Sequence, residues 1–185
     1  YAVLNQSYYN GGDLPTQNIV VLKLNQAGNL QWRKPLNDLS PRKLIFDHSS
    51  NLILATHGTG KIIKLNTSGD TIWNYSSSII VTDIAIDSKN NIVVSGYGGG
   101  IGFFDYVTIK LSSDGSEIWR KQFNSEENLR DFAYCLAIDK ENNTYVSGSS
   151  HDMVSQGVCY TLRYSESGQL LWQQKYNALH SIFEN

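Results

Sequence analysis

The most constraining feature of this 185-residue chain is a twelve-residue string that occurs four times without a gap. The copies are VLKLNQAGNLQW, IIKLNTSGDTIW, TIKLSSDGSEIW and TLRYSESGQLLW. Each copy has a basic residue in third position, a glycine five residues later and a tryptophan four residues beyond the glycine. The basic residues are Lys23, Lys64, Lys110 and Arg163, the glycines are Gly28, Gly69, Gly115 and Gly168, and the tryptophans are Trp32, Trp73, Trp119 and Trp172. Because glycine supplies the positive φ of a tight turn between apolar runs, each string predicts a β-hairpin.

A second string lies between these copies and has the form Asp-x-x-x-Asn within β-branched and apolar residues. It occurs as LIFDHSSNLILA, IAIDSKNNIVVSG and LAIDKENNTYVSG, with Asp47, Asp87 and Asp139 as its aspartates. An aspartate side chain accepts hydrogen bonds from turn N–H groups, and the asparagine four residues later tolerates a left-handed backbone. The second string therefore also predicts a hairpin.

The two hairpins together make one repeat of four short strands. Successive tryptophans are 41, 46 and 53 residues apart, which brackets the period of about 40 to 50 residues of a β-propeller blade. Helical repeats of that period need amphipathic stretches of about ten residues or more, which the sequence lacks. We therefore predict an all-β fold, a β-propeller of four-stranded antiparallel blades with about four blades present. The predicted blades are residues 1–36, which lack a first strand, 37–77, 78–123 and 124–177.

Both ends of the sequence fall inside predicted blades. Residues 1–3 align with residues 144–146, and residues 181–184 resemble residues 44–47 at the end of a first strand. Residues 178–185 therefore begin a next blade or close a four-bladed ring. Closure removes exposed sheet edges, but four-bladed rings are uncommon, so we favour an excerpt of a larger propeller. The sequence starts without a methionine or a signal peptide, which predicts processing or an excerpt.

These strings resemble the bacterial and archaeal β-propeller repeat family of secreted and cell-surface proteins. The resemblance rests on K-L-x-x-x-G-x-x-x-W and I-x-D-x-x-x-N-x-x-V-x-G and covers nearly the whole chain. Its Gly-x-x-x-Trp part is also similar to the tryptophan-docking motif of quinoprotein and outer-membrane assembly lipoprotein propellers. The first resemblance implies an extracellular, cell-surface or periplasmic location. The second implies a fragment of a quinoprotein-like (PQQ-type) enzyme as the alternative function.

The recurrence of the motif residues favours structural roles. A tryptophan at the same strand position of every repeat is expected to pack between neighbouring sheets rather than to stack on sugars. Each basic residue is expected to pack its stem along the blade, with its charge at a carboxylate or in solvent, rather than to join a cationic ring. The recurring aspartates are expected to cap turns rather than to act as general acids.

Charge and cysteine spacing exclude several further classes. A formal net charge of -2 provides no basic field for nucleic acid or a lipid surface, and no apolar run approaches the roughly 18 residues of a membrane span. Cys135 and Cys159 lack a C-x-x-C spacing. They are expected on the first and third strands of one blade, about 9.6 Å apart, beyond the roughly 7 Å limit of a disulfide. We expect buried free thiols.

No catalytic or metal-binding motif stands out. The four histidines share no metal-like spacing, SSDGSEIW lacks one residue of the sialidase Asp-box, and the glycine-rich residues 96–102 precede a predicted strand rather than a phosphate-binding helix. We therefore expect no enzymatic activity, no metal and no cofactor. Four N-x-S/T sequons are candidate glycosylation sites, at Asn5, Asn66, Asn74 and Asn142.

Function is expected on the loops that differ between repeats, which are residues 6–18, 96–105, 124–131 and 149–157. Variable loops on a rigid scaffold commonly carry binding sites. The candidate contacts are Tyr8, Tyr9, Asp13, Tyr97, Phe103, Phe104, Asp105, Asp131, His151 and Asp152. We expect a non-enzymatic scaffold or binding platform for protein or glycan, with further blades or domains of the same protein as neighbours.

Overall fold

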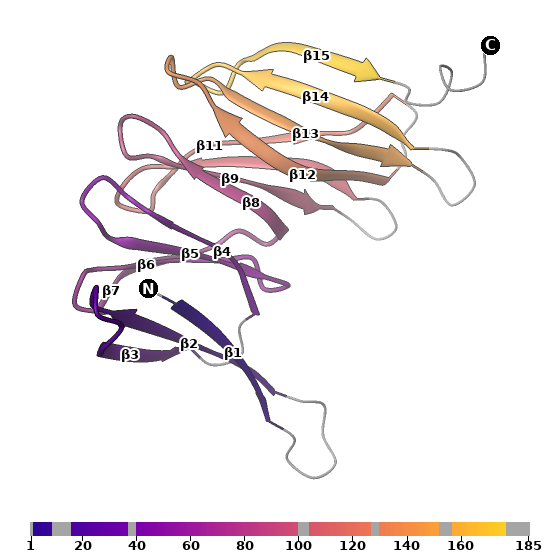
Figure 1. Ribbon diagram of the computed structural model, residues 1–185. Coiled ribbons are helices and arrows are strands. Elements are labelled where there is room, and N and C mark those ends of the chain that lie inside the picture. Colours follow the sequence, from indigo (N-terminus) through magenta and orange to yellow (C-terminus); the bar gives the residue numbers. More distant parts are fainter. Residues whose placement is uncertain are drawn as a thin grey trace, which may run out of the picture. The chain divides into compact units, whose positions relative to one another are not determined.

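The computed structural model describes residues 2–8, 16–36, 40–99, 104–126, 130–151 and 157–176, with the backbone alone for residues 2–8 and 16–18. These residues form fifteen β-strands and no helix (Figure 1). The strands make one three-stranded and three four-stranded sheets, all antiparallel. The predicted all-β fold with about four blade-like sheets is therefore confirmed. The described residues accordingly contain no helix that could cross a membrane.

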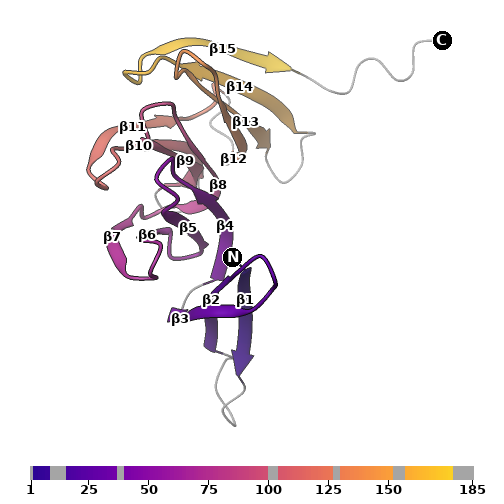
Figure 2. The same ribbon diagram turned by 60° about the vertical axis from the view of Figure 1, so that its left-hand side comes forward.

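Each sheet consists of strands that follow one another in the sequence, so every neighbour is a hairpin partner (Figures 1 and 2). The first sheet contains β1 (Ala2–Tyr8), β2 (Thr16–Leu24) and β3 (Leu30–Leu36), and the second contains β4 (Ser40–Phe46), β5 (Leu52–His57), β6 (Lys61–Leu65) and β7 (Thr71–Ser76). The third contains β8 (Ile80–Ile86), β9 (Ile92–Gly98), β10 (Asp105–Leu111) and β11 (Glu117–Phe123). The fourth contains β12 (Arg130–Ile138), β13 (Thr144–His151), β14 (Val158–Tyr164) and β15 (Leu170–Tyr176). Residues 178–185, expected to begin a blade or to close a ring, lie outside the described residues.

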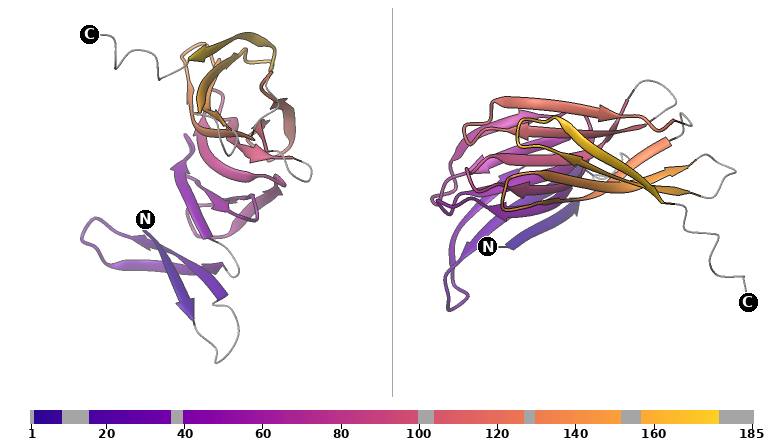
Figure 3. Two further views of the ribbon diagram at one scale, coloured as in Figure 1. Left: turned by 90° about the vertical axis from the view of Figure 1, so that its right-hand side faces the viewer. Right: turned by 90° about the horizontal axis from the view of Figure 1, so that it is seen from above.

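The chain divides into two compact units, Tyr1–Ser77 and Ser78–Asn185, each of which holds two sheets (Figure 3). Apolar side chains fill the space between the two sheets of each unit. In the first unit they are Ile19, Val21, Leu52, Leu54, Ile63 and Leu65, and in the second Tyr106, Ala133, Val146, Tyr160, Leu162 and Tyr164. Strands β5 and β9 are buried over five consecutive residues, which explains why they read as continuous apolar runs instead of alternating ones.

The glycine turns have the predicted geometry. Gly28, Gly69, Gly115 and Gly168 have φ values of 80°, 90°, 90° and 81°. In all four hairpins the basic residue lies opposite the tryptophan, and the register shifts at the next position. One extra residue on the last strand thus forms the same bulge four times.

The aspartate turns differ from the prediction in one respect. The Asp47 carboxylate accepts the N–H groups of Ser49 and Asn51 at 2.9 and 2.8 Å, and its other oxygen accepts the Asn51 side-chain amide at 2.8 Å. Asp87 and Asp139 repeat this arrangement. The residue with positive φ, however, is the one before the recurring asparagine, namely Ser50, Asn90 or Asn142. The asparagine itself contributes its side-chain amide to the aspartate.

Tryptophans join the sheets within each unit. Trp32 donates its indole N–H to the Thr67 carbonyl at 3.0 Å, and Trp119 donates to the Glu166 carbonyl at 3.0 Å. Both acceptors lie two residues before the glycine of the next sheet's turn. A Cβ on Gly168 would lie 2.8 Å from the Trp119 ring, and one on Gly69 would lie 3.1 Å from the Trp32 ring. Glycine is therefore required at these two positions for two reasons. It allows the positive φ, and it leaves room for the indole ring.

Candidate functional site

Five rings gather where the second unit carries its variable loops. Tyr97 lies near the end of β9, Phe104 precedes β10, Phe132 and Tyr134 lie on β12, and His151 ends β13. The Phe132 ring is central, with centroid distances of 4.8 Å to Tyr97, 5.6 Å to Phe104, 6.4 Å to Tyr134 and 5.1 Å to His151. Tyr97 and Phe104 also meet edge to face at 5.4 Å. These residues are called the loop-end aromatic cluster below.

Close backbone contacts hold the cluster in place. The Asp131 N–H donates to the Phe104 carbonyl at 2.6 Å, which ties the start of β12 to the segment before β10. A Cβ on Gly148 would lie 2.0 Å from the Phe132 carbonyl oxygen, so only glycine fits opposite this part of β12. The register of β12 then shifts between Ala133 and Cys135. The resulting bulge sets the direction of Tyr134 independently of the strand's alternation.

The cluster combines aromatic faces with polar groups. Tyr134 is 51% exposed, whereas Tyr97, Phe104, Phe132 and His151 are half-buried. Ser149 donates its hydroxyl to the Tyr134 hydroxyl at 3.1 Å, and the same Ser149 oxygen lies 3.4 Å from His151 Nδ1. Rings with hydroxyl and imidazole groups at their edges can contact an apolar face and bond to polar groups beside it.

Asp131 has a structural position beneath the cluster. It is fully buried, and its carboxylate accepts the Ser125 N–H at 2.6 Å. Its other oxygen and the hydroxyl of buried Tyr106 have no hydrogen-bond partner among the described residues. Burial, together with the nearby charge of Asp131, raises the pKa of the Tyr106 phenol well above its usual range. Asp131 therefore anchors the loop and is not accessible to a ligand.

The other predicted contacts divide into three groups. Tyr97, Phe104 and His151 come together in the cluster. Asp105 is half-buried, and its carboxylate accepts a hydrogen bond from the Gln122 amide. The remaining residues are not part of any described site: Tyr8 is described by its backbone alone, and Tyr9, Asp13, Phe103 and Asp152 lie outside the described residues.

Sequence reasoning missed Phe132 and Tyr134. Both lie on a first strand, just beyond the loop range that was considered. A signal was present, because the aligned positions of the preceding repeat are Ile80 and Thr82. Two aromatic replacements at the loop end of a repeated strand mark a local departure from the structural pattern.

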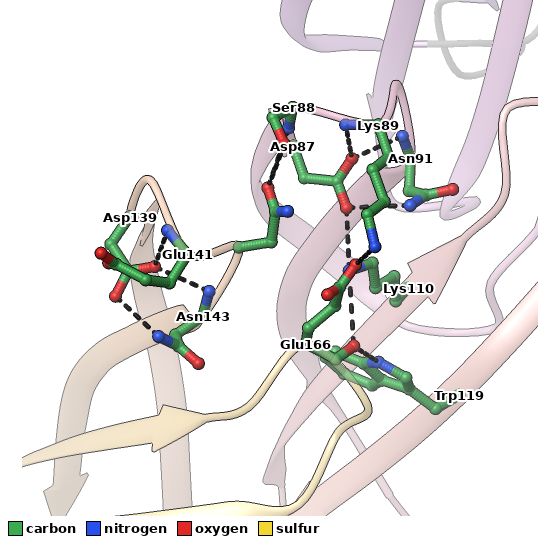
Figure 4. Close-up of polar contacts among 11 residues, drawn as sticks. Asp87, Ser88, Lys89, Asn91, Lys110, Trp119, Asp139, Glu141, Asn143 and Glu166 are labelled. Atoms are coloured by element: carbon green, nitrogen blue, oxygen red, sulfur yellow. Dashed lines mark hydrogen bonds and ion pairs between the residues drawn. The ribbon is translucent and has the colours of Figure 1, made fainter.

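The opposite ends of the sheets carry ion pairs between the recurring residues. Lys64 Nζ lies 2.9 Å from Asp47 Oδ2, and Lys110 Nζ lies 2.8 Å from Asp87 Oδ2 (Figure 4 shows the latter). Arg163 pairs with Asp139 at 3.4 Å. Lys64, Lys110 and Arg163 thus each reach the aspartate turn of their own sheet, which agrees with the expected carboxylate contact. Lys23 instead donates to the Thr67 carbonyl.

These pairs shift the carboxyl pKa values. Burial by itself raises the pKa of Asp47 and Asp87, but the hydrogen bonds from asparagine and lysine outweigh it, so both pKa values fall below the ordinary value of 3.8. The pKa of Asp139 is lowered in the same way, with Asn143 and Tyr145 among its hydrogen-bond donors. All three carboxylates therefore remain charged and bonded at neutral pH, which suits turn capping and not proton transfer.

The cysteine and glycosylation expectations need correction. Cys135 and Cys159 are free but exposed, because both lie on the side of β12–β15 that faces away from β8–β11. Asn142 is only 6% exposed, and its Oδ1 accepts the N–H and hydroxyl of Ser88 at 2.9 Å each. This burial excludes a glycan at Asn142 in the folded unit.

The remaining candidates for modification or metal binding are placed as follows. Asn66 accepts two N–H groups of its own turn, Asn74 is exposed on β7, and Asn5 is described by its backbone alone. No group of three or more histidine, cysteine, aspartate or glutamate side chains in the described part of the chain could hold a metal ion.

Among the comparisons with known proteins, one solved structure supports the fold. No family model matches the sequence, and none of the curated proteins matches it. A crystal structure of a protein from Lactobacillus plantarum is similar with a TM-score of 0.57 and 10% identity, over 88% of this chain and 51% of that one. This chain therefore spans about half the length of the Lactobacillus protein. A crystal structure of a protein of unknown function from Bacteroides caccae has a TM-score of 0.45 and 8% identity, over 94% of this chain and 93% of that one.

Proposed function

We propose that this protein is a non-enzymatic module of blade-like repeats that binds a glycan or a protein segment at the loop-end aromatic cluster. The observation that carries the proposal is the meeting of five rings from two neighbouring sheets at the end where the repeats differ. The glycine turns at the other end have the same backbone in all four sheets, and an indole covers two of them, at Gly69 and Gly168. Binding is therefore assigned to the end that varies.

The chemistry of the cluster supports this class of ligand. Half-buried rings present rigid apolar faces, which lose little conformational entropy when a ligand binds. The hydroxyl of the exposed Tyr134 and the His151 imidazole stand at the edge of these faces and can bond to hydroxyl or amide groups of a sugar or a peptide. Asp131, the carboxylate directly beneath, is buried and engaged, so it supports a structural role and not acid–base chemistry.

A glycan array and a peptide array probed with the purified 185-residue chain test the proposal, followed by calorimetric titration of the hits. Phe132→Ala removes the central ring and is expected to weaken binding at least about tenfold. Tyr134→Phe keeps the ring but removes the hydroxyl, so it reports on polar recognition without a risk to the fold. Ile118→Ala is the matched control, because Ile118 is an apolar side chain, 49% exposed, beside a glycine turn. Absence of hits on both arrays, or binding that Phe132→Ala leaves unchanged, contradicts the proposal.

We further propose an extracellular, cell-surface or periplasmic location, and further blades or domains of the same protein beyond this module. The support is the resemblance of the repeats to secreted propellers and the occurrence of a similar fold in a chain about twice as long. Fractionation of cells that express the complete gene tests the location. Recovery of the full-length protein only in the cytosol would contradict it.

A quinoprotein-like enzyme is the second candidate. The indole-to-turn hydrogen bonds of Trp32 and Trp119 favour it, because they have the form that the tryptophan-docking motif implies. Such an enzyme would hold its cofactor with polar side chains on the innermost strands. Absorption of the purified full-length protein in the quinone bands would support this candidate and contradict the binding module.

A further inference from the structure

One side of the β12–β15 sheet is uncovered within its unit. The other side packs on β8–β11 through Ala133, Val146, Tyr160 and Leu162. Along β13 the residues alternate strictly between buried and half-buried, whereas β9 is buried over five consecutive residues. The uncovered side, called the outer face below, carries Cys135, Tyr145, Cys159, Arg163, Trp172 and Tyr176. In Figure 1 no other strand of the Ser78–Asn185 unit lies on this face.

Equivalent residues of the third and fourth sheets show how much of the outer face is exposed. Trp119 of β11 is 8% exposed, because it lies on the Gly168 turn of the fourth sheet. Trp172 occupies the same register position in β15 and is 40% exposed. Four residues further along, Phe123 packs on Tyr106 and Tyr160, whereas the equivalent Tyr176 is 64% exposed. The outer face thus has the residues of a docked face without the covering sheet.

The outer face also carries the hydrogen-bond donors that join one sheet to the next. In both observed contacts between sheets, one carbonyl of the turn accepts the indole N–H and a lysine ammonium. Lys23 donates to Thr67 O at 2.7 Å, and Lys110 donates to Glu166 O at 3.4 Å. Arg163 holds the equivalent position opposite Trp172, and its side chain is 29% exposed. The outer face therefore offers two donors, from Trp172 and Arg163, to one carbonyl.

The matching acceptor occurs on the first sheet. The turn between β2 and β3 has the same backbone as the two occupied turns, with Gly28 at φ 80° and its N–H bonded to Asn25 O. Gln26 stands where Thr67 and Glu166 stand in the occupied turns. A Cβ on Gly28 would meet nothing within 4 Å, whereas Gly69 and Gly168 are each covered by an indole.

Because the chain carries both halves of a contact that it makes twice, we propose that the outer face binds the β1–β3 sheet of a second copy of this chain. Trp172 lies over Gly28 of that copy, and its indole N–H donates to the Gln26 carbonyl. The contact is head to tail, so each pair of copies leaves one outer face and one Gly28 turn free, and assembly continues until a ring closes or a filament forms. This inference rests on the sheet contacts alone and not on the proposed binding of a glycan or protein.

Sedimentation velocity of the 185-residue chain over a hundredfold range of concentration tests the proposal. Trp172→Ala removes the indole and is expected to weaken association at least about tenfold, as loss of a central aromatic contact does. Leu171→Ala is its matched control. Leu171 is 46% exposed, and its equivalent in β11, Ile118, remains 49% exposed beside a docked sheet. Leu171 therefore lies outside the proposed contact.

A second pair of variants distinguishes loss of the contact from loss of folding stability. Gly28→Ala places a Cβ where the indole of the second copy would lie, and it strains a backbone at φ 80°. Gly58→Ala introduces the same strain at φ 77°, also with nothing within 4 Å, at a turn that takes no part in docking. Equal unfolding midpoints for these two variants show that any difference in association comes from the contact.

The expected result is a sedimentation coefficient that rises with concentration for the wild type, Leu171→Ala and Gly58→Ala, and remains that of a monomer for Trp172→Ala and Gly28→Ala. A wild type that is monomeric over the whole range overturns the proposal. Association that survives both Trp172→Ala and Gly28→Ala overturns it as well, because it shows a different interface.

Discussion

The ion pair between Lys110 and Asp87 gives the sharpest test of how each sheet is held together. The two side chains are 1% and 0% exposed, and their charged atoms are 2.8 Å apart. Lys110→Met keeps the length and the apolar stem of the side chain but removes the ammonium group. Asp87 is then a buried carboxylate without its counter-charge.

The expected loss of unfolding free energy depends on the hydrogen bonds that Asp87 retains in the variant. Removal of one partner of a buried pair commonly costs about 3 to 5 kcal/mol. Asp87 retains the N–H groups of Lys89 and Asn91 and the Asn91 amide, so we place Lys110→Met at the lower end, about 3 kcal/mol. Arg163→Met is the comparison, because the Arg163–Asp139 pair is 3.4 Å long with side chains 29% and 21% exposed. Its loss should cost about 1 kcal/mol or less.

Urea unfolding followed by circular dichroism measures the loss of unfolding free energy in Lys110→Met and in Arg163→Met, provided that the m-value is unchanged. The double variant Lys110→Met/Asp87→Asn completes a mutant cycle and is expected to lose less than the sum of the single changes, because it leaves no buried charge. A loss for Lys110→Met that is no larger than the loss for Arg163→Met would refute the reasoning, since burial would then have no influence on these pairs.

Three further predictions follow from the contacts within the units. Because the carboxyl pKa values of Asp47 and Asp87 are lowered on folding, their contribution to stability is complete above the ordinary pKa of 3.8 and is lost as the pH falls through the lowered values. Urea titrations should therefore show stability falling below about pH 4, with a shallower fall in Asp87→Asn. Ellman's reagent should label both cysteines in the folded Trp172→Ala variant, in which the proposed association is lost, as both are exposed in a single copy; protection of either in that variant would contradict the placement of the outer face. Asp83→Ala removes the acceptor of the Leu136 N–H at 2.9 Å and should lower the unfolding free energy by about 1 to 2 kcal/mol, which thermal unfolding measures.

Turn chemistry made much of the fold readable from the sequence. The positive φ of Gly28, Gly69, Gly115 and Gly168 and the capping by Asp47, Asp87 and Asp139 depend on residues within a turn, so short strings suffice to predict them. Recurrence predicted tryptophans between sheets, which the structure shows for Trp32 and Trp119. One repeat by itself would not distinguish a packed indole from an exposed one.

Contacts that depend on register were beyond the sequence. Lys110 and Asp87 belong to different hairpins, and only the order of β8, β9 and β10 brings them together. The cysteines were placed on the correct strands, but their exposure depends on which side of the sheet is covered. The aromatic cluster likewise depends on the β12 bulge, which turns Tyr134 out of the regular alternation.

Hydrogen exchange of the indole N–H groups tests most directly the central claim that the two sheets within each unit dock through a tryptophan. In a ¹⁵N-labelled sample with each indole signal assigned by substitution, Trp32 and Trp119 should exchange slowly, because both donate to turn carbonyls at 3.0 Å. Gly168→Ala, whose Cβ would lie 2.8 Å from the Trp119 ring, should accelerate exchange at Trp119 and leave Trp32 unchanged. Fast exchange at both indoles in the wild type, or a Trp119 signal that Gly168→Ala does not affect, would contradict the account.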